Sequence, residues 1–293
     1  MFIATLIAAE SITAADISAA ADRIDTAGGT VDRWVWIDDA RAADIRFTGD
    51  AAAARDALEG SIAATDIAVQ PAATRDKALL IADMDSTMIT VECIDELADY
   101  AGIKPQIAEV TERAMRGELD FASALDARVA LLAGLGEDAI QRCLDERVKL
   151  MPGAKTLVQT MRARGATTIL VSGGFTRFAQ PVGQALGFHR MIANRLLIED
   201  GKLTGHVRKP IVDATTKEVT LLAAIDELGI DPAATLAVGD GANDLPMIRR
   251  AGLGVAYRAK PIVAAEAAAR VDHGDLTALL YMQGISRAEW VQD

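Results

Sequence analysis

The order of strand-like and helix-like hydrophobic patterns divides the chain into two parts. Up to about residue 70, short apolar runs typical of strands alternate with alanine-rich stretches whose apolar residues have helical spacing. We expect strands at residues 2–8, 30–37, 43–47 and 67–69, and helices at 14–27 and 51–58. This βαββαβ order predicts a small α+β domain. The polar segment 70–77 that follows it indicates a linker.

From residue 78 onward, buried-strand patterns alternate with helices, which is typical of a doubly wound parallel sheet. The strand patterns lie at 78–82, 167–171, 235–238 and 253–256. Helices are expected from Pro152-Gly153 onward and at 177–186, 216–228, 261–269 and 275–282. The pair Asp200-Gly201, between strand patterns at 192–199 and 202–207, predicts an inserted β-hairpin.

Amphipathic helical patterns interrupt this order directly after the first buried strand. Apolar residues have helical spacing in the stretches 94–101, 107–115, 121–132 and 140–148. We expect a helical-bundle cap at about 88–150, placed to exclude water when a ligand binds. The predicted domains are therefore 1–72 and 73–293, the second with a core of 78–87 and 151–293.

Composition limits the partners and the compartment. The formal net charge of −12 argues against nucleic acid or an anionic membrane surface as a main partner. Cys93 and Cys143 are the only cysteines and lack CxxC spacing, so we expect neither a disulfide framework nor a zinc site. The apolar run within 1–10 has no cationic start and is short for a signal peptide, and no later run approaches a membrane span. We therefore expect a cytoplasmic protein.

Polar residues gather where three of the predicted parallel strands end. They are Asp83 and Asp85, then Ser172-Gly173-Gly174, and then Asp240 and Asp244. Carboxyl ends of parallel strands meet at one edge of an open sheet, where such folds bind ligands. Lys217, near the start of the helix before the third of these strands, is expected at the same edge.

Carboxylates brought together in this way need a compensating cation, since like charges at close range raise one another's pKa. A hard metal with oxygen ligands is implied, and Mg²⁺ fits best. Asp83 and Asp240 are the expected side-chain ligands, and the backbone carbonyl of Asp85 is a further candidate. Asp244 is expected to orient the metal ligands or Lys217.

The same residues supply the groups that phosphoryl transfer needs. Asp83 can attack phosphorus to give an aspartyl phosphate. Asp85 can protonate the departing alcohol and later deprotonate the attacking water. Ser172 and Lys217 can hold the phosphoryl oxygens, together with backbone N–H groups of the glycine-rich turns.

In order and spacing, these residues resemble the four motifs of the haloacid-dehalogenase-like phosphatases. The matching segments are Asp83-Met84-Asp85-Ser86-Thr87, Ser172-Gly173-Gly174, Lys217 and Gly239-Asp240-Gly241-Ala242-Asn243-Asp244. The resemblance covers about 78–285, and its weakest motif is the single lysine. It implies a Rossmann-type α/β fold and Mg²⁺-dependent phosphatase activity. The order of elements before residue 70 is similar to the ACT-type regulatory fold, without a specific motif. Two roles therefore stay open for this domain. It could mediate dimerisation, which would make the protein a homodimer, or it could bind an amino acid as a sensor.

Within that family, the closer resemblance is to the enzymes that hydrolyse O-phospho-L-serine in the last step of serine biosynthesis. It depends on Glu92 and on the run from Met115-Arg116-Gly117 through Phe121 to Arg128. The resemblance implies that Glu92 receives the amino group of the substrate and Arg128 its carboxylate, and charge supports both assignments. Met115 and Phe121 would form the apolar wall of the lid.

Asn243 is expected to hydrogen-bond near the phosphate. Taken singly, these residues also fit ordinary roles: a polar turn at Asp83, a surface lysine at Lys217, or helix-surface charges at Glu92 and Arg128. Their joint order favours catalysis. Alternative functions are a phosphatase for another small phosphate ester, phosphoryl transfer to a second alcohol, and an amino-acid-sensing protein with a vestigial phosphatase domain.

Overall fold

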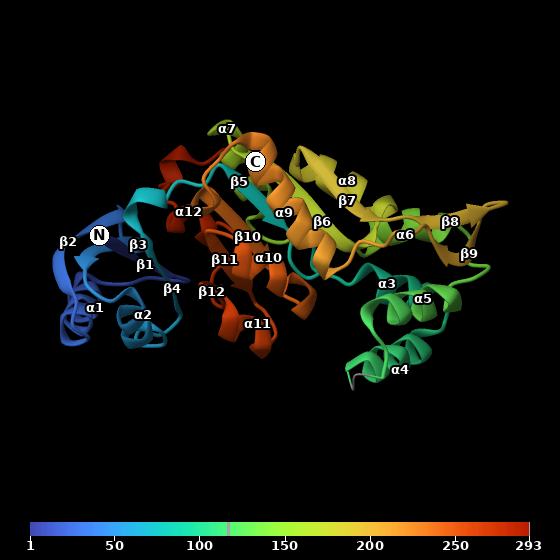
Figure 1. Cartoon of the computed structure of the whole chain (residues 1–293), viewed down its shortest axis with the longest axis horizontal. Coiled ribbons are helices and arrows are strands. Elements are labelled where there is room, and N and C mark those ends of the chain that lie inside the picture. The colour runs from blue at the N-terminus through green and yellow to red at the C-terminus, as the bar shows by residue number, and fades with distance from the viewer. Residues whose placement is uncertain (116–117, 293) are drawn as a thin grey trace.

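The computed structural model describes residues 1–115 and 118–292, with Met115 described by its backbone alone. A small N-terminal unit and a helical cap lie at opposite ends of a central sheet core (Figure 1). No described helix combines the length and the apolar character that a membrane crossing requires.

The N-terminal unit has the expected order of elements. They are β1 (Phe2–Ala8), α1 (Ala14–Thr26), β2 (Thr30–Asp38), β3 (Ala42–Thr48), α2 (Ala51–Leu58) and β4 (Thr65–Pro71). The strands pair antiparallel in the order β2-β3-β1-β4. Ile17 and Ile24 of α1 pack with Leu6 and Phe47 of the sheet in a hydrophobic core of their own. Thr13 starts α1 with a capping box, in which its hydroxyl accepts from Asp16 N–H.

The core is the doubly wound parallel sheet that the sequence predicts. Its strands are β5 (Leu79–Ala82), β6 (Thr167–Phe175), β7 (Arg190–Asn194), β10 (Thr235–Gly239), β11 (Leu253–Tyr257) and β12 (Ala269–Val271). They are parallel in the order β12-β11-β10-β5-β6-β7. One face packs against α7 (Ala154–Ala163), α8 (Thr176–Leu186) and α12 (Ala278–Met282). The other packs against α9 (Ala214–Leu228), α10 (Leu245–Arg250) and α11 (Pro261–Glu266).

Several expectations about element bounds are wrong. The helix expected at 261–269 ends at Glu266, and the alanine-rich sequence after it forms β12 because it pairs with β11. The strand expected at 192–199 is two strands, since the chain leaves the sheet after β7 and pairs again in a hairpin as β8 (Leu196–Glu199). The last helix begins at Ala278, after a turn at Asp275.

The segment expected as a linker is packed between the N-terminal unit and the core. Ala68 of β4 pairs with Ala269 of β12, so all described strands except β8 and β9 form one continuous ten-stranded sheet. Arg75 donates to both carboxylate oxygens of Asp44, at 2.5 and 2.6 Å, and to the carbonyl oxygen of Met282 at 3.0 Å. The proposed boundary at residue 72 therefore lies within a well-bonded junction.

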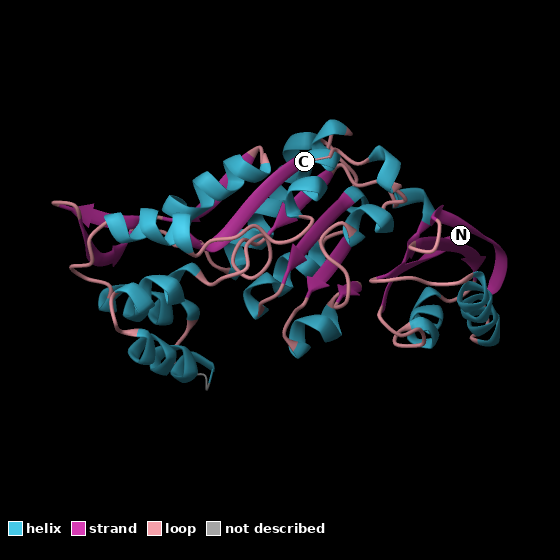
Figure 2. Ribbon diagram, turned by 180° about the vertical axis from the view of Figure 1, so that it is seen from behind, coloured by secondary structure: helices cyan, strands magenta, loops and turns pink. Residues whose placement is uncertain are grey.

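The cap has the expected helices: α3 (Cys93–Tyr100), α4 (Lys104–Met115), α5 (Phe121–Leu131) and α6 (Asp138–Glu146). The hairpin of β8 and β9 (Lys202–Val207) packs on them, at the end of the molecule opposite the N-terminus (Figure 2). Backbone bonds join the two parts, from Gly134 N–H to Leu203 O at 2.8 Å and from Leu203 N–H to Leu135 O at 2.9 Å. The hairpin thus connects the core to the cap.

Candidate active site

A cleft of about 450 Å³ lies between the cap and the carboxyl ends of β5, β6 and β10. Most of the residues predicted for the site line it: Asp83, Asp85, Glu92, Phe121, Arg128, Ser172, Gly173, Gly174, Asp240 and Asn243. Lys217 and Asp244 are fully buried next to them. The side chain of Met115 lies outside the described residues.

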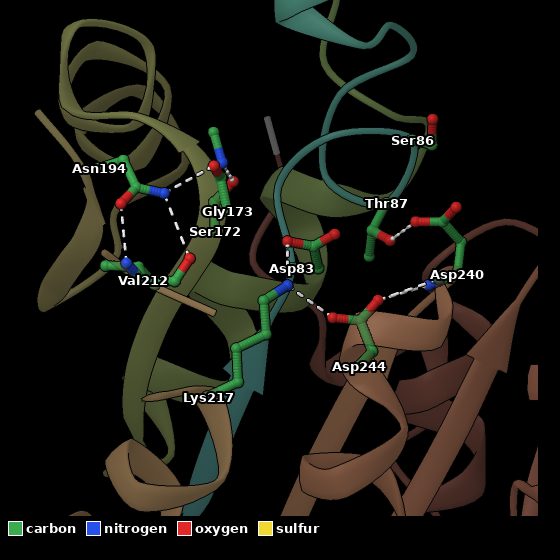
Figure 3. A network of polar contacts seen from close by, with 12 residues as sticks. Asp83, Ser86, Thr87, Ser172, Gly173, Asn194, Val212, Lys217, Asp240 and Asp244 are labelled. Carbon is green, nitrogen blue, oxygen red and sulfur yellow. Dashed lines mark hydrogen bonds and ion pairs between the residues drawn. The ribbon is translucent and has the colours of Figure 1, made fainter. Parts of the chain in front are cut away.

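Lys217 joins two strand ends through its ammonium group (Figure 3). Its Nζ donates to Asp83 Oδ1 and to Asp244 Oδ1, each at 2.6 Å. The N-cap Asp213 fixes the first turn of α9, where Lys217 lies, by accepting from Thr216 N–H. Burial lowers the pKa of Lys217, but the carboxylates of Asp244 and Asp83 raise it more, so the net shift is upward. Lys217 therefore stays charged.

Asp244 also shapes the loop that carries Asp240. Its Oδ2 accepts from the N–H groups of Asp240 at 3.2 Å and Gly241 at 3.0 Å. A Cβ atom at Gly239 would lie 2.4 Å from this carboxylate, so only glycine allows the close approach. Thr87 Oγ donates to Asp240 Oδ1 at 3.1 Å and ties the loop after β5 to the loop after β10.

The carboxylates of Asp83, Asp240 and Asp244 fit a metal ion. Each offers an oxygen within 4.8 Å of the others. Burial, followed by the charge of Asp244, raises the pKa of Asp83 well above its usual value. Burial and Asp244 likewise raise the pKa of Asp240 to about 6. Among the described residues, Asp85 contributes no side-chain oxygen to this cluster.

Asp85 is suited to carry a proton. Burial, and after it the negative charge of Glu92, raises the pKa of Asp85 to about 7. Its Oδ1 is buried without a hydrogen-bond partner in the described part of the chain. A carboxyl group with this pKa exchanges protons readily near neutral pH.

The segment Ser172-Gly173-Gly174 lies beside Asp85 in the irregular last part of β6, which continues to Phe175 and does not end at residue 171 as expected. Ser172 Oγ accepts from Gly174 N–H at 2.9 Å. A Cβ atom at Gly174 would lie 3.0 Å from both Asp85 Oδ2 and Ser172 Oγ, which explains the glycine. Asn194, at the end of β7, donates to Gly173 O at 2.8 Å and to Val212 O at 3.2 Å (Figure 3). The sequence analysis did not predict a role for Asn194. The one feature that could have indicated it is a polar residue at the end of an apolar strand.

The cap supplies the opposite wall of the cleft. Ser86 Oγ donates to Glu92 Oε1 at 2.6 Å. Arg128 is half-buried, and its Nε donates to Ala124 O at 3.3 Å. A Cβ atom at Gly173 would lie 3.1 Å from Phe121 Cζ, so the ring of Phe121 reaches the last part of β6.

Sequence analysis also missed two charged residues that line the cleft, Asp95 and Lys260. Lys260 N–H donates to Asp240 O at 3.1 Å. Lys260 follows β11. Because ligand-binding residues lie at the carboxyl ends of parallel strands, its position after this strand could have predicted it. Asp95 lies in the first turn of α3, three residues after the N-cap residue Glu92.

Comparisons with known proteins agree with this geometry. The sequence profile of the haloacid dehalogenase-like hydrolases matches residues 80–249. A phosphoserine phosphatase of Haemophilus influenzae is 48% identical over 202 residues, which cover 69% of this chain and 64% of that protein. The chain thus spans less than two thirds of the length of that relative.

Solved structures extend the similarity to the N-terminal unit. A HAD-family hydrolase from Salmonella enterica serovar Typhi has a TM-score of 0.81 at 30% identity, covering 96% of this chain and 98% of that one. A probable phosphoserine phosphatase from Vibrio cholerae, in its unliganded form, has a TM-score of 0.76 at 32% identity, with coverages of 98% and 87%.

Proposed function

We propose, from the premise that this chain belongs to the haloacid dehalogenase-like hydrolase family, that it hydrolyses O-phospho-L-serine to L-serine and phosphate. One observation carries the proposal: the cleft that Asp83 and Asp85 line is also lined by a carboxylate and a guanidinium, those of Glu92 and Arg128. The first pair suits phosphoryl transfer and the second suits the ammonium and carboxylate of an amino acid. Relatives named phosphoserine phosphatase support the same substrate.

In the first step, Asp83 attacks phosphorus through a carboxylate oxygen. A bond forms from phosphorus to Asp83, the bond from phosphorus to the serine oxygen breaks, and Asp85 gives its proton to that oxygen. Lys217 holds Asp83 Oδ1 at 2.6 Å and favours its ionised form. Serine leaves as a neutral alcohol, and Asp83 carries the phosphoryl group.

In the second step, Asp85 is ionised and takes a proton from water. The water oxygen bonds to phosphorus, and the bond from phosphorus to Asp83 breaks. This returns Asp83 to its carboxylate form and Asp85 to its acid form. The pKa of about 7 at Asp85 suits both directions of proton transfer.

Asp83 and Asp240 would hold the metal, with Asp244 fixing the Asp240 loop. A bound divalent cation neutralises charge on the phosphoryl oxygens. Ser172 and the N–H groups of Gly173 and Gly174 would hold the same oxygens. Lys217 uses two of its three donors on Asp83 and Asp244, which leaves one for phosphate.

Three finer expectations belong to this proposal: Mg²⁺ as the metal, a cytoplasmic location, and a homodimer formed through residues 1–72. The donor set of carboxylates supports Mg²⁺. Cys93 and Cys143 are buried and unpaired, which fits a reducing compartment. The antiparallel unit ends in the edge strand β2, where a second copy could pair.

Phosphate release from phosphoserine and from p-nitrophenyl phosphate, with and without Mg²⁺, tests the proposal. We expect Asp83→Asn to lower kcat for both substrates by about a thousandfold or more while the circular dichroism spectrum is retained. We expect Arg128→Ala to raise KM for phosphoserine by about tenfold or more, and KM for the aryl phosphate far less. Arg142→Ala on the exposed surface of α6 is the matched control.

Near-normal turnover by Asp83→Asn would rule out the covalent mechanism. An equal rise in KM for both substrates in Arg128→Ala would rule out the amino-acid substrate.

A further inference from the structure

We propose that Ser86 is a positioning residue that makes the cleft selective for substrates with an ammonium group, by holding the carboxylate of Glu92 in place. The inference rests on the proposed function, because it concerns the same cleft and substrate. It assigns a task to a hydroxyl that the proton-transfer and phosphate-binding steps leave unused.

The contact between the two side chains is short and specific. Ser86 Oγ lies 2.6 Å from Glu92 Oε1, a distance typical of a hydrogen bond to an ionised carboxylate. Glu92 is exposed at the edge of the cleft, so its side chain would otherwise sample several rotamers. One bonded oxygen restricts these rotamers and leaves Oε2 for a ligand. A carboxylate held in advance binds an ammonium with less loss of entropy.

The backbone of Ser86 is arranged for this contact. Its φ of +57° lies in the left-handed region, which residues other than glycine seldom adopt. The loop is held there by local bonds, from Met88 N–H to Met84 O at 2.8 Å and from Ser86 N–H to Val91 O at 3.4 Å. Strain of this kind persists where the surrounding structure requires it, often at functional sites. Here it brings Ser86 against the residues that precede α3.

The charges around Glu92 explain why a hydroxyl is needed. Asp85 and Asp95 line the same cleft and repel the carboxylate of Glu92. The positive charge of Arg128 attracts the carboxylate of Glu92. A direct ion pair between Glu92 and Arg128 would occupy the two groups proposed to bind the substrate. The neutral hydroxyl of Ser86 holds Glu92 in place, so that Glu92 and Arg128 need not pair with each other and stay available to the substrate.

The position of Ser86 in the chain couples recognition to reaction. Ser86 directly follows Asp85, and Thr87 bonds to Asp240 (Figure 3). Consecutive residues therefore serve proton transfer, substrate selection and the metal-binding loop. In Figure 3 the hydroxyl of Ser86 points away from the Lys217 network, so it acts apart from that network.

Selectivity, not rate alone, tests the inference. The readout is the ratio of kcat/KM for phosphoserine to kcat/KM for the phosphate ester of 3-hydroxypropanoate. This second substrate differs from phosphoserine only in lacking the amino group. We expect Ser86→Ala to lower this ratio about three- to tenfold, mainly through KM for phosphoserine. Ser86→Gly removes the same hydroxyl but relieves the left-handed strain, and it should lower the ratio equally.

Glu92→Gln separates this inference from the proposed function. We expect Glu92→Gln to remove most of the selectivity, and Ser86→Ala to add little to it in the double variant. If Glu92→Gln leaves the ratio intact, the proposed substrate is wrong. If Glu92→Gln lowers the ratio but Ser86→Ala and Ser86→Gly do not, the role of Ser86 alone is refuted. A loss in Ser86→Ala that is equal for both substrates would also refute it, because it would indicate a structural role in the loop.

Discussion

At the scale of residues, the floor of the cleft holds more negative charge than its own cation balances. Lys217 contacts both Asp83 and Asp244, while Asp240 and Asp85 add further carboxyl groups nearby. Burial, and after it the negative charge of Asp244 on Asp240 and of Glu92 on Asp85, raises the pKa of Asp240 to about 6 and that of Asp85 to about 7. Without a metal, protons therefore reduce the charge near neutral pH.

This balance predicts how metal binding depends on pH. A cation binds ionised carboxylates, so below about pH 6 it must displace a proton from Asp240, and one from Asp83 where that group is protonated. We expect the affinity of the metal-free protein for Mg²⁺ to rise from about pH 5 to about pH 7, by up to about tenfold per unit for each proton displaced. Titration calorimetry in buffers of different ionisation enthalpy measures both the affinity and the protons released.

Asp240→Asn is the control for this prediction, since it removes a proposed ligand and the proton that competes with the metal. Affinity for Mg²⁺ that stays constant over this pH range, with no proton release, would contradict it.

The sequence predicts some of these residues better than others. Asp83, Asp85 and Asp240 follow apolar strands, so strand order alone brings them to one edge. Asn194 differs, because its role depends on contacts with Gly173 and Val212, which are distant in sequence. A single polar residue after a strand carries no sign of such partners.

At the scale of elements, the β8–β9 hairpin determines how the cap meets the core. Two exposed ion pairs join the cap to the rest of the core domain, from Lys209 to Asp126 at 2.7 Å and from Arg177 to Glu137 at 3.0 Å. Exposed pairs of this kind contribute little to stability. Close packing contributes more: Gly205 of β9 lies where a Cβ atom would be 2.9 Å from Ala133 Cβ and 3.3 Å from Ala130 Cα and O.

Gly205→Ala should therefore displace the cap. Its methyl group would press on the end of α5, the helix that carries Arg128, and its backbone φ of +83° adds strain. Gly201→Ala in the same hairpin is the matched control, because its φ is +72° but its nearest neighbour would be 4.0 Å away. We expect Gly205→Ala to lower the free energy of unfolding by about 1–3 kcal/mol more than Gly201→Ala in urea titrations. KM for phosphoserine should rise only in the former. Equal effects of the two variants would show that strain alone matters.

The order of elements was more predictable than their ends. The helical spacing of apolar residues identified the cap helices that the structure describes, although α5 has no distinct apolar face. It failed at β12, where Ala267 and Ala269 belong to an alanine-rich sequence that favours a helix locally. This segment forms a strand because it pairs with β11 and β4. Local hydrophobic periodicity does not reveal pairing between segments that are distant in sequence.

At the scale of the whole molecule, the continuous sheet makes the N-terminal unit part of the core's edge. Backbone pairing between β4 and β12 is brief, so side chains carry much of the junction. Asp66 of β4 is buried and accepts from the N–H groups of Asp272 at 2.9 Å, His273 at 3.1 Å and Gly274 at 2.8 Å. Such a nest of backbone donors favours an anion. Arg75 and Asp44 form a second contact across the same junction.

Asp66→Asn should loosen this junction. The amide has one acceptor oxygen, and its NH₂ group would face a backbone N–H that now donates to Oδ2, so a buried donor is left unpaired. We expect a loss of about 1–3 kcal/mol in the free energy of unfolding, and faster hydrogen exchange confined to residues 65–71 and 272–274. Asp56→Asn, on the exposed side of α2, makes the same change of charge and should do neither. Because the cleft lies at the ends of β5, β6 and β10, which β11 separates from β12 in the sheet, kcat for phosphoserine should change much less than stability. Faster exchange throughout the core in Asp66→Asn would instead mean that the N-terminal unit and the core unfold as one cooperative body.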